Sequence, residues 1–213
     1  MSPLGRGTAV AAAVIAAMAL GRVVTETWPV NDVTTAPFVR SGAVAEPVRT
    51  EYATITVDGV RAARTLVTGG LSEPPAATAG GVFLVADVTV RATRRTENID
   101  GLYLVDAEGL RHEGTARGGC ATGMFAPAGV DWHAMACFDV APDVLEGAYL
   151  VVARGGGDLD GYYQARDEVV HVDLALTADR AAQLAASTET YATWLPGPEP
   201  YDTRPWSPER EAP

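Results

Sequence analysis

The sequence contains no lysine: all sixteen of its basic residues are arginines, and they stand against 27 acidic residues. Its net charge is −11 over 213 residues, and no block of basic residues interrupts this acidic balance. Contacts to nucleic-acid phosphates need clustered Lys or Arg side chains, so the composition argues against a nucleic acid as partner. A second long apolar run is also missing, which argues against a membrane protein with several spans.

The short motifs that mark common catalytic and cofactor sites are missing as well. There is no G-x-S-x-G nucleophile elbow, no H-x-H or H-E-x-x-H pair, and no glycine-rich loop leading into a helix and a Lys. The three histidines, His112, His133 and His171, are spread one to a predicted strand, whereas a zinc site needs three or four converging ligands. We therefore expect surface histidines, no metal, no cofactor and no catalysis.

Hydrophobic residues make up 47% of the chain, which indicates a folded domain rather than a disordered protein. From residue 42 onward, short segments alternate between apolar and polar residues. Every second residue from 84 to 90 is apolar, and residues 132–140 repeat this pattern, so one face of each segment is expected in the core. Asp58-Gly59 is typical of a two-residue hairpin turn, which predicts strands on either side of it.

Seven to nine such strands, with glycine- and proline-rich turns and no long helix between them, predict an all-β fold. We expect an antiparallel sandwich over residues 43–176. A short helix is expected at 177–186, capped by Thr177. Residues 26–42 are expected to form a linker. Residues 187–213 are rich in proline and are expected to form a disordered tail, in which Trp194 and Trp206 are incidental or dock onto a partner.

The N-terminus carries an uncharged, alanine-rich run between Arg6 and Arg22. Its fifteen residues would extend about 22 Å as a helix, short of the roughly 30 Å of a hydrocarbon core. If Arg22 reaches outward to the headgroups, residues 7–25 cover about 28 Å, and Trp28 follows at the interface. We therefore expect residues 1–25 to be an uncleaved transmembrane anchor.

Two alternatives to an anchor remain open for this segment. Apolar runs of about 7–15 residues are typical of cleaved signal peptides, and Ala17-Met18-Ala19 matches their A-x-A cleavage pattern. A soluble helix this apolar would instead have to be buried on all sides. Both the anchor and the signal place the rest of the chain outside the cytoplasm.

Cys120 and Cys137 are the only two cysteines. An even number of cysteines in an exported protein suggests a disulfide, and closing a loop of about 17 residues would stabilise the fold by about 3 kcal/mol. Two free buried thiols are the alternative. No His and Asn or Asp pair is placed beside either cysteine, so a catalytic cysteine would lack a base.

Two further segments have both a structural and a ligand-binding interpretation. Asp158-Leu-Asp160-Gly161 is similar to part of a calcium-binding loop, but Asp167 stands where the loop needs Glu, and a solvated hairpin turn explains the segment more simply. Arg91, Arg94 and Arg95 form the only basic cluster. They are either a charged strand end or a contact for an anionic ligand.

Four motifs occur in a characteristic order: residues 81–90, residues 102–109, Phe125-Ala-Pro-Ala-Gly129 and Cys137-Phe-Asp-Val-Ala-Pro142. Together they resemble the immunoglobulin-like domain of unknown function found in exported lipoproteins and membrane-anchored proteins of Gram-positive bacteria, as an actinobacterial-type member. The resemblance covers roughly residues 43–176. This chain departs from the family at residues 91–95, where an Asn-rich turn is usual, and at His112, where an aromatic residue is common. It also lacks a lipobox cysteine.

The resemblance implies a small β-sandwich outside the membrane and no catalytic residues. With the N-terminal segment, it leads us to expect a single-pass cell-membrane protein whose extracytoplasmic immunoglobulin-like domain binds or assembles with an envelope protein partner. The alternative is a secreted, soluble protein, released by signal-peptide cleavage, that binds a small ligand.

Overall fold

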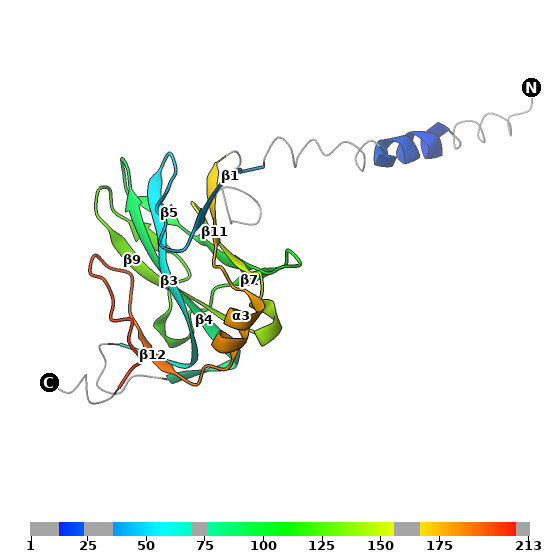
Figure 1. Ribbon diagram of the computed structural model, residues 1–213. Helices are drawn as coiled ribbons and strands as arrows, with labels where there is room; N and C mark the ends of the chain where they lie inside the picture. The colour runs from blue at the N-terminus through cyan, green and yellow to red at the C-terminus, as the bar shows by residue number, and fades with distance from the viewer. Residues whose placement is uncertain (1–12, 24–35, 70–75, 156–166, 208–213) are drawn as a thin grey trace, which may run out of the picture. The chain divides into compact units, whose positions relative to one another are not determined.

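The computed structural model describes residues 13–23, 36–69, 76–155 and 167–207, which fall into two compact units, residues 1–36 and 37–213 (Figure 1). In the first unit, residues 13–23 are helical and their side chains are exposed. The other residues of the expected anchor, 1–12 and 24–25, lie outside the described part. Among the described residues, no helix is both long enough and apolar enough to cross a membrane.

The second unit is built mainly of strands. They are β1 (Phe38–Ala43), β2 (Val48–Arg49), β3 (Ala53–Thr68), β4 (Ala76–Ala92), β5 (Glu97–Ile99), β6 (Gly101–Val105), β7 (Arg111–Glu113), β8 (Met124–Ala126), β9 (Trp132–Val140), β10 (Tyr149–Ala153), β11 (Glu168–Asp173) and β12 (Thr190–Thr193). Its described residues also form one α-helix, α3 (Ala178–Ala185), and two 3₁₀ turns, η1 (Arg117–Gly119) and η2 (Pro142–Val144). The Thr177 hydroxyl accepts a hydrogen bond from a backbone N–H of α3, which confirms the predicted cap.

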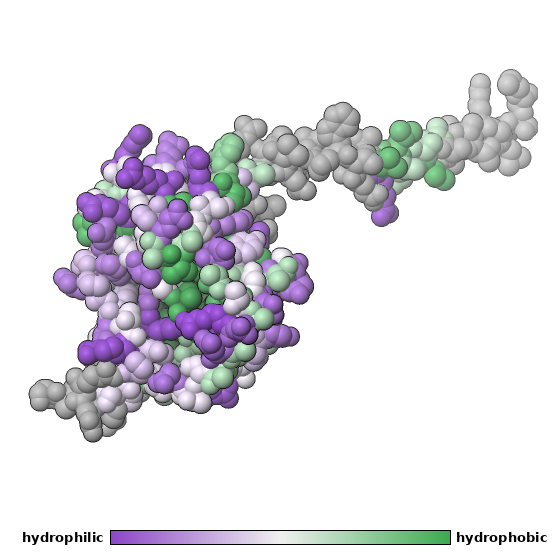
Figure 2. All heavy atoms as spheres, in the orientation of Figure 1, coloured by the Kyte–Doolittle hydropathy of each residue, from purple (hydrophilic) through white to green (hydrophobic). Residues whose placement is uncertain are grey.

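The strands form a β-sandwich of two five-stranded sheets, with β5 and β8 paired beside them. The first sheet has the order β1-β11-β10-β6-β7. The second has the order β12-β3-β4-β9, with β2 also paired to β3. Figure 2 shows hydrophilic residues over most of the visible face of this unit and a narrower strip of hydrophobic residues at its middle.

The main core lies between the two sheets and confirms the predicted inward faces of β4 and β9. Leu84 and Val88 from β4 meet Ala136 and Phe138 from β9 there, together with residues of β6, β10 and β11 from the first sheet. Alternation puts every second side chain of a strand on the same face, so the wholly apolar set turns inward. The outer residues of the same two strands, such as Phe83 and Met135, are also fully buried, which alternation alone does not predict.

The predicted hairpin at Asp58-Gly59 is wrong. These residues lie inside β3, a single 16-residue strand that pairs with β4 along its length. The register shifts between Val57, which faces Val88, and Gly59, which faces Asp87, so that Asp58 is an extra residue in a β-bulge. The chain does not turn back at Asp58-Gly59, because the 17-residue β4 pairs with β3 on both sides of the bulge.

Both ends of the domain extend beyond the predicted limits of 43 and 176. β1 lies in the expected linker and pairs in parallel with β11. β12 lies in the expected disordered tail and pairs in parallel with β3. The sandwich is therefore not purely antiparallel, and the prediction of disorder is corrected for residues 190–207. Backbone pairing to an edge strand needs no apolar pattern, which is why hydrophobic periodicity does not reveal it.

Candidate functional site

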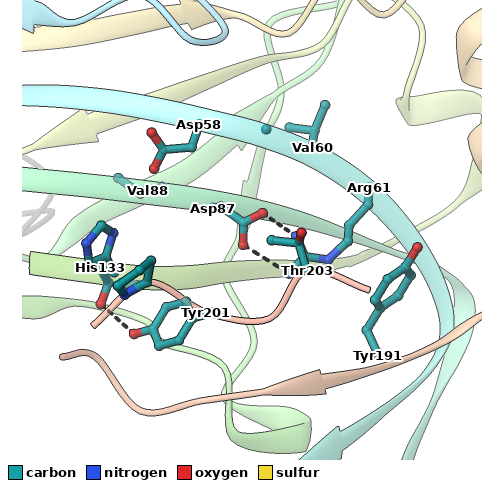
Figure 3. Close-up of a pocket in the computed structure, with 12 residues that line it drawn as sticks. Asp58, Val60, Arg61, Asp87, Val88, His133, Tyr191, Tyr201 and Thr203 are labelled. Atoms are coloured by element: carbon teal, nitrogen blue, oxygen red, sulfur yellow. Dashed lines mark hydrogen bonds and ion pairs between the residues drawn. The ribbon is translucent and has the colours of Figure 1, made fainter. Parts of the chain in front are cut away.

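A cavity of about 480 Å³ lies between the outer face of the second sheet and the C-terminal segment, residues 190–207 (Figure 3). Strands β3, β4, β9 and β12 all contribute to it. The residues that line it are Asp58, Gly59, Val60, Arg61, Asp87, Val88, His133, Ala134, Tyr191, Pro200, Tyr201 and Thr203. A volume of this size is in the range of about 300–1,000 Å³ that is usual for small-molecule sites.

The C-terminal segment is held on the sheet by backbone hydrogen bonds at several points. β12 runs along β3 from Thr190, opposite Thr65, to Thr193, opposite Thr68. Further on, His133 and Gly197 exchange two backbone hydrogen bonds of 2.7 and 3.0 Å. The N–H of Trp206 donates to the carbonyl oxygen of Thr190 at 2.7 Å. The segment therefore forms a fixed roof over the outer face of the second sheet.

Beneath this roof lies a second, smaller core. Phe83 and Val85 from β4 and Met135 from β9 are buried there, and Trp194 packs against them from the C-terminal segment. The expectation that Trp194 is incidental is thus corrected: its indole lies so close to Gly69 that an added Cβ would come within 2.7 Å of it. This core explains why both faces of β4 are apolar over half of its length.

The predicted disulfide between Cys120 and Cys137 is present. Both residues are buried in the smaller core. Cys137 lies on β9, and Cys120 directly follows η1, so the bridge ties the loop before β8 to the outer face of the second sheet. Neither cysteine lines the cavity.

The charged pair of the cavity is Arg61 and Asp87. The two guanidinium NH groups of Arg61 each bond one carboxylate oxygen of Asp87, and the side chains are only 12% and 13% exposed. The same guanidinium lies 5.1 Å from the ring centre of Tyr191, a cation–π distance. Burial raises the pKa of Asp87, and the nearby charge of Asp58 adds to this, although Arg61 opposes both.

A second polar chain crosses three strands at the other side of the cavity. The Thr89 hydroxyl donates to Oδ2 of Asp58, and its oxygen lies 2.8 Å from Nδ1 of His133. The bulge in β3 lets the consecutive residues Asp58 and Gly59 both lie on this face, and it turns Arg61 onto the same face. No other hydrogen-bond partner of the Asp58 or His133 side chains is found among the residues that the structure describes.

Tyr201 joins the roof to β9. Its hydroxyl lies 2.5 Å from the carbonyl oxygen of His133 and 2.9 Å from that of Leu195. Burial, with a smaller contribution from the charge of Asp87, raises the pKa of Tyr201 to about 12. Tyr201 therefore stays protonated at neutral pH and can donate one of these hydrogen bonds, and its ring forms a wall of the cavity (Figure 3).

The three histidines are not brought together, but none is a freely exposed surface residue either. His112 lies 2.8 Å from Asp106, whose pKa it lowers by hydrogen bonding. His171 packs against the Tyr149 ring, and burial lowers its pKa. Only His133 lines the cavity. In the described part of the chain, no three His, Cys, Asp or Glu residues are grouped so as to hold a metal ion.

The predicted basic cluster is divided among ion pairs and a second cavity. Arg91 pairs with Asp131 at the surface, and Arg95 pairs with the buried Glu97. Arg94 and Arg95 line a cavity of about 370 Å³ that is also lined by acidic residues, so its charges largely balance. The calcium-loop candidate, residues 158–161, lies outside the described residues.

Most residues of the main cavity were not identified from the sequence. Asp87 carried the clearest signal, because it is the one charge within the mostly apolar run of residues 82–90, and a charge that is buried needs a partner. Nothing in the sequence joins it to Arg61, 26 positions earlier, or to Tyr191 and Tyr201, because these pairings depend on the bulge and on the C-terminal segment.

No protein family matches the chain, and no curated protein matches it. The chain is similar to the solved structure of the yjhA protein from Bacillus subtilis, at 14% identity and a TM-score of 0.43, over 62% of this chain and 99% of that one. It is also similar to an uncharacterized β-sandwich protein from Clostridium difficile 630, at 9% identity and a TM-score of 0.37, over 63% of this chain and 95% of that one. At these identities the likeness concerns the fold alone.

Proposed function

We propose that this protein is a binding protein of the cell envelope whose immunoglobulin-like sandwich binds a small ligand outside the cytoplasm, without catalysis. The observation that carries this proposal is the cavity beneath the C-terminal segment. Its walls come from four strands and a hydrogen-bonded roof, and its polar groups are held in place by one another. Sites that bind small molecules are commonly largely preformed in this way, with a few fixed polar groups among apolar walls.

The extracytoplasmic location is supported by the disulfide and by the N-terminal segment. Disulfides persist in oxidising compartments and are rare in the cytoplasm. The alanine-rich run before Arg22 suits an anchor or a signal, and we propose that it stays attached as a single span. Cell fractionation with mass measurement of the mature N-terminus tests this. A mature chain that begins at Leu20 and is found in the medium would rule out the anchor.

The immunoglobulin-like assignment is proposed from the order of the motifs. The four motifs of the resemblance fall on β4, on β6 and the turn that follows it, on the segment from β8 onward, and on the end of β9. The first and fourth motifs lie in the second sheet, the second motif lies in the first sheet, and the third lies in the separate β5–β8 pair, so the motifs include strands of both layers of the sandwich.

Small-ligand binding can be tested by blocking the cavity from within. Gly59 lines the cavity, and a Cβ added there would meet nothing within 4 Å, so Gly59→Phe is expected to fold and to fill the space. The matched control is Gly80→Phe, at an exposed position of β4 outside the cavity where an added Cβ lies 3.7 Å from its nearest neighbour.

The measurement is a thermal-shift screen of the full chain against neutral, cationic and anionic metabolites. A ligand at a hundred times its Kd stabilises the folded state by about 2.7 kcal/mol, or about 5–10 °C in Tm for a domain of this size. We expect compounds that raise the Tm of the wild type and of Gly80→Phe but not of Gly59→Phe. If no compound shifts the wild type, or if every shift persists in Gly59→Phe, the proposal is wrong.

A protein partner is the second candidate function, and one surface favours it. Trp194, Pro198 and Pro200 border an open cavity of about 440 Å³ on the C-terminal segment, and the adjoining Leu195 is 77% exposed. Exposed apolar residues grouped in this way are typical of interaction sites. A photo-crosslinking residue at position 195 in the membrane-resident protein is expected to capture one envelope protein reproducibly. The same residue at position 110, where Leu is 64% exposed directly before β7, is the control.

A further inference from the structure

We propose that the cavity beneath the C-terminal segment recognises a small organic cation, an amine carried on an apolar or aromatic body. This inference rests on the proposed small-ligand function and names the chemistry of the ligand. It is drawn from which hydrogen-bonding groups the cavity leaves open, from its charge balance, and from the nature of its walls.

The cavity leaves a hydrogen-bond acceptor open at Asp58. An ionised carboxylate can only accept, so the single proton of the Thr89 hydroxyl points to Asp58. His133 must then donate its Nδ1 proton to the Thr89 oxygen, 2.8 Å away. Oδ1 of Asp58, an exposed residue, has no hydrogen-bond partner among the described residues and is therefore an acceptor open to a donor on the ligand.

The charge of the cavity points the same way. Among the described residues that line it, Asp58 and Asp87 bring two negative charges, and Arg61 brings the one permanent positive charge, which Asp87 already binds through both of its oxygens. Asp58 and Asp87 are near enough to repel each other. The remaining donor of Arg61, Nε, is buried beneath the surface, so it is not available to a ligand. A cation beside Asp58 would neutralise the excess negative charge and relieve this repulsion.

The walls favour an organic cation over a metal ion. Asp87 is occupied by Arg61, so an ion in the cavity would find one carboxylate and one imidazole, fewer protein ligands than zinc or calcium sites provide. Val60, Pro200 and the rings of Tyr191 and Tyr201 instead form a surface that suits an apolar or aromatic body. Aromatic rings beside a carboxylate also attract ammonium groups through their π faces.

Three matched compounds test the inference: tyramine, its neutral alcohol analogue tyrosol, and the anion 4-hydroxyphenylacetate. Each is titrated calorimetrically into the full chain in a non-ionic detergent near pH 7. Because hydrogen bonds between charged groups are stronger than neutral ones, we expect tyramine to bind roughly tenfold or more tightly than tyrosol, and the anion to bind most weakly. Asp58→Asn should weaken tyramine binding by a similar factor and leave tyrosol unchanged. Asp143→Asn, the same change at an exposed position outside the cavity, should alter neither.

The outcomes separate this inference from the function on which it rests. If tyrosol or the anion binds as tightly as tyramine, and Gly59→Phe abolishes that binding, the cavity is a ligand site but not one for cations. If tyramine binds equally well to Asp58→Asn, the assigned carboxylate is wrong. If none of the three compounds binds the wild type, the inference fails, and the metabolite screen then decides whether the cavity binds any small molecule.

Discussion

Reducing the disulfide between Cys120 and Cys137 should lower the free energy of unfolding by about 3 kcal/mol. The bridge joins positions 17 apart, and the chain-entropy relation for a loop of this length gives a loss of about 10 cal/mol/K, or about 3 kcal/mol at 25 °C. The loop between the cysteines contains β8 and Ala121, which forms a β-bridge with Ala136. These contacts remain after reduction. Both sulfur atoms also stay in the smaller core after reduction, so the main effect of reduction is the loss of the cross-link.

Equilibrium unfolding in urea, with and without a thiol reductant, measures this difference. Trp132 packs on the main core and Trp194 on the smaller one, so tryptophan fluorescence follows both. With an m-value of about 1–3 kcal/mol/M, the midpoint should fall by about 1–3 M. The double variant Cys120→Ala/Cys137→Ala should have a midpoint that no longer responds to reductant.

One result would refute this reasoning. If mass spectrometry after thiol alkylation shows complete reduction, but the midpoint moves by less than about 0.3 M with the m-value unchanged, the cross-link does not stabilise through the unfolded chain as the entropy relation requires. A large fall in the midpoint together with a changed m-value would instead indicate a change in the compactness of the folded or the unfolded state.

Three further predictions concern single positions. Gly81→Ala would place its Cβ 2.1 Å from a carbonyl oxygen of β9 and should destabilise the fold by about 1–3 kcal/mol in urea unfolding, whereas Gly80→Ala, with 3.7 Å of room, should have little effect. Thr177→Ala removes the cap of α3 and should cost about 1 kcal/mol in the same assay, with Thr177→Ser restoring most of it. The raised pKa of Asp87 means that its contribution to stability is greatest below its unfolded pKa of about 3.9 and is lost as the pH rises through its folded pKa. The stability of the wild type relative to Asp87→Asn should therefore decrease as the pH rises from about 4 toward neutrality, and a relative stability that increases over this interval would contradict the pKa direction.

Local patterns were enough to predict much of the sandwich. The alternation in residues 82–91 and 132–140 correctly assigned the inward faces of β4 and β9, because a strand with one wholly apolar face has a single favourable orientation against a core. The cap at Thr177 was likewise predictable, since it depends on neighbours only three residues away.

The same local reasoning failed at Asp58-Gly59. This dipeptide is compatible with a hairpin turn and also with a β-bulge. The bulge forms because β4 is long enough to pair with β3 on both sides of the dipeptide. The consequence reaches the candidate site, because the bulge places Asp58 and Arg61 on the outer face of the second sheet, where both line the cavity.

The sequence alone therefore determined the class of fold, the direction of its main faces and the pair of cysteines available for a bridge, since each depends on periodicity or on residue type. Asp87 is a charge in a largely apolar strand, but the sequence did not single it out as a site residue. The tertiary structure decided where that charge finds its partner and what covers it. β12 and the residues after it pair with the second sheet through backbone hydrogen bonds. These bonds do not depend on a pattern of side chains, so the sequence pattern does not predict them. The cavity exists only because this segment folds back over the sheet.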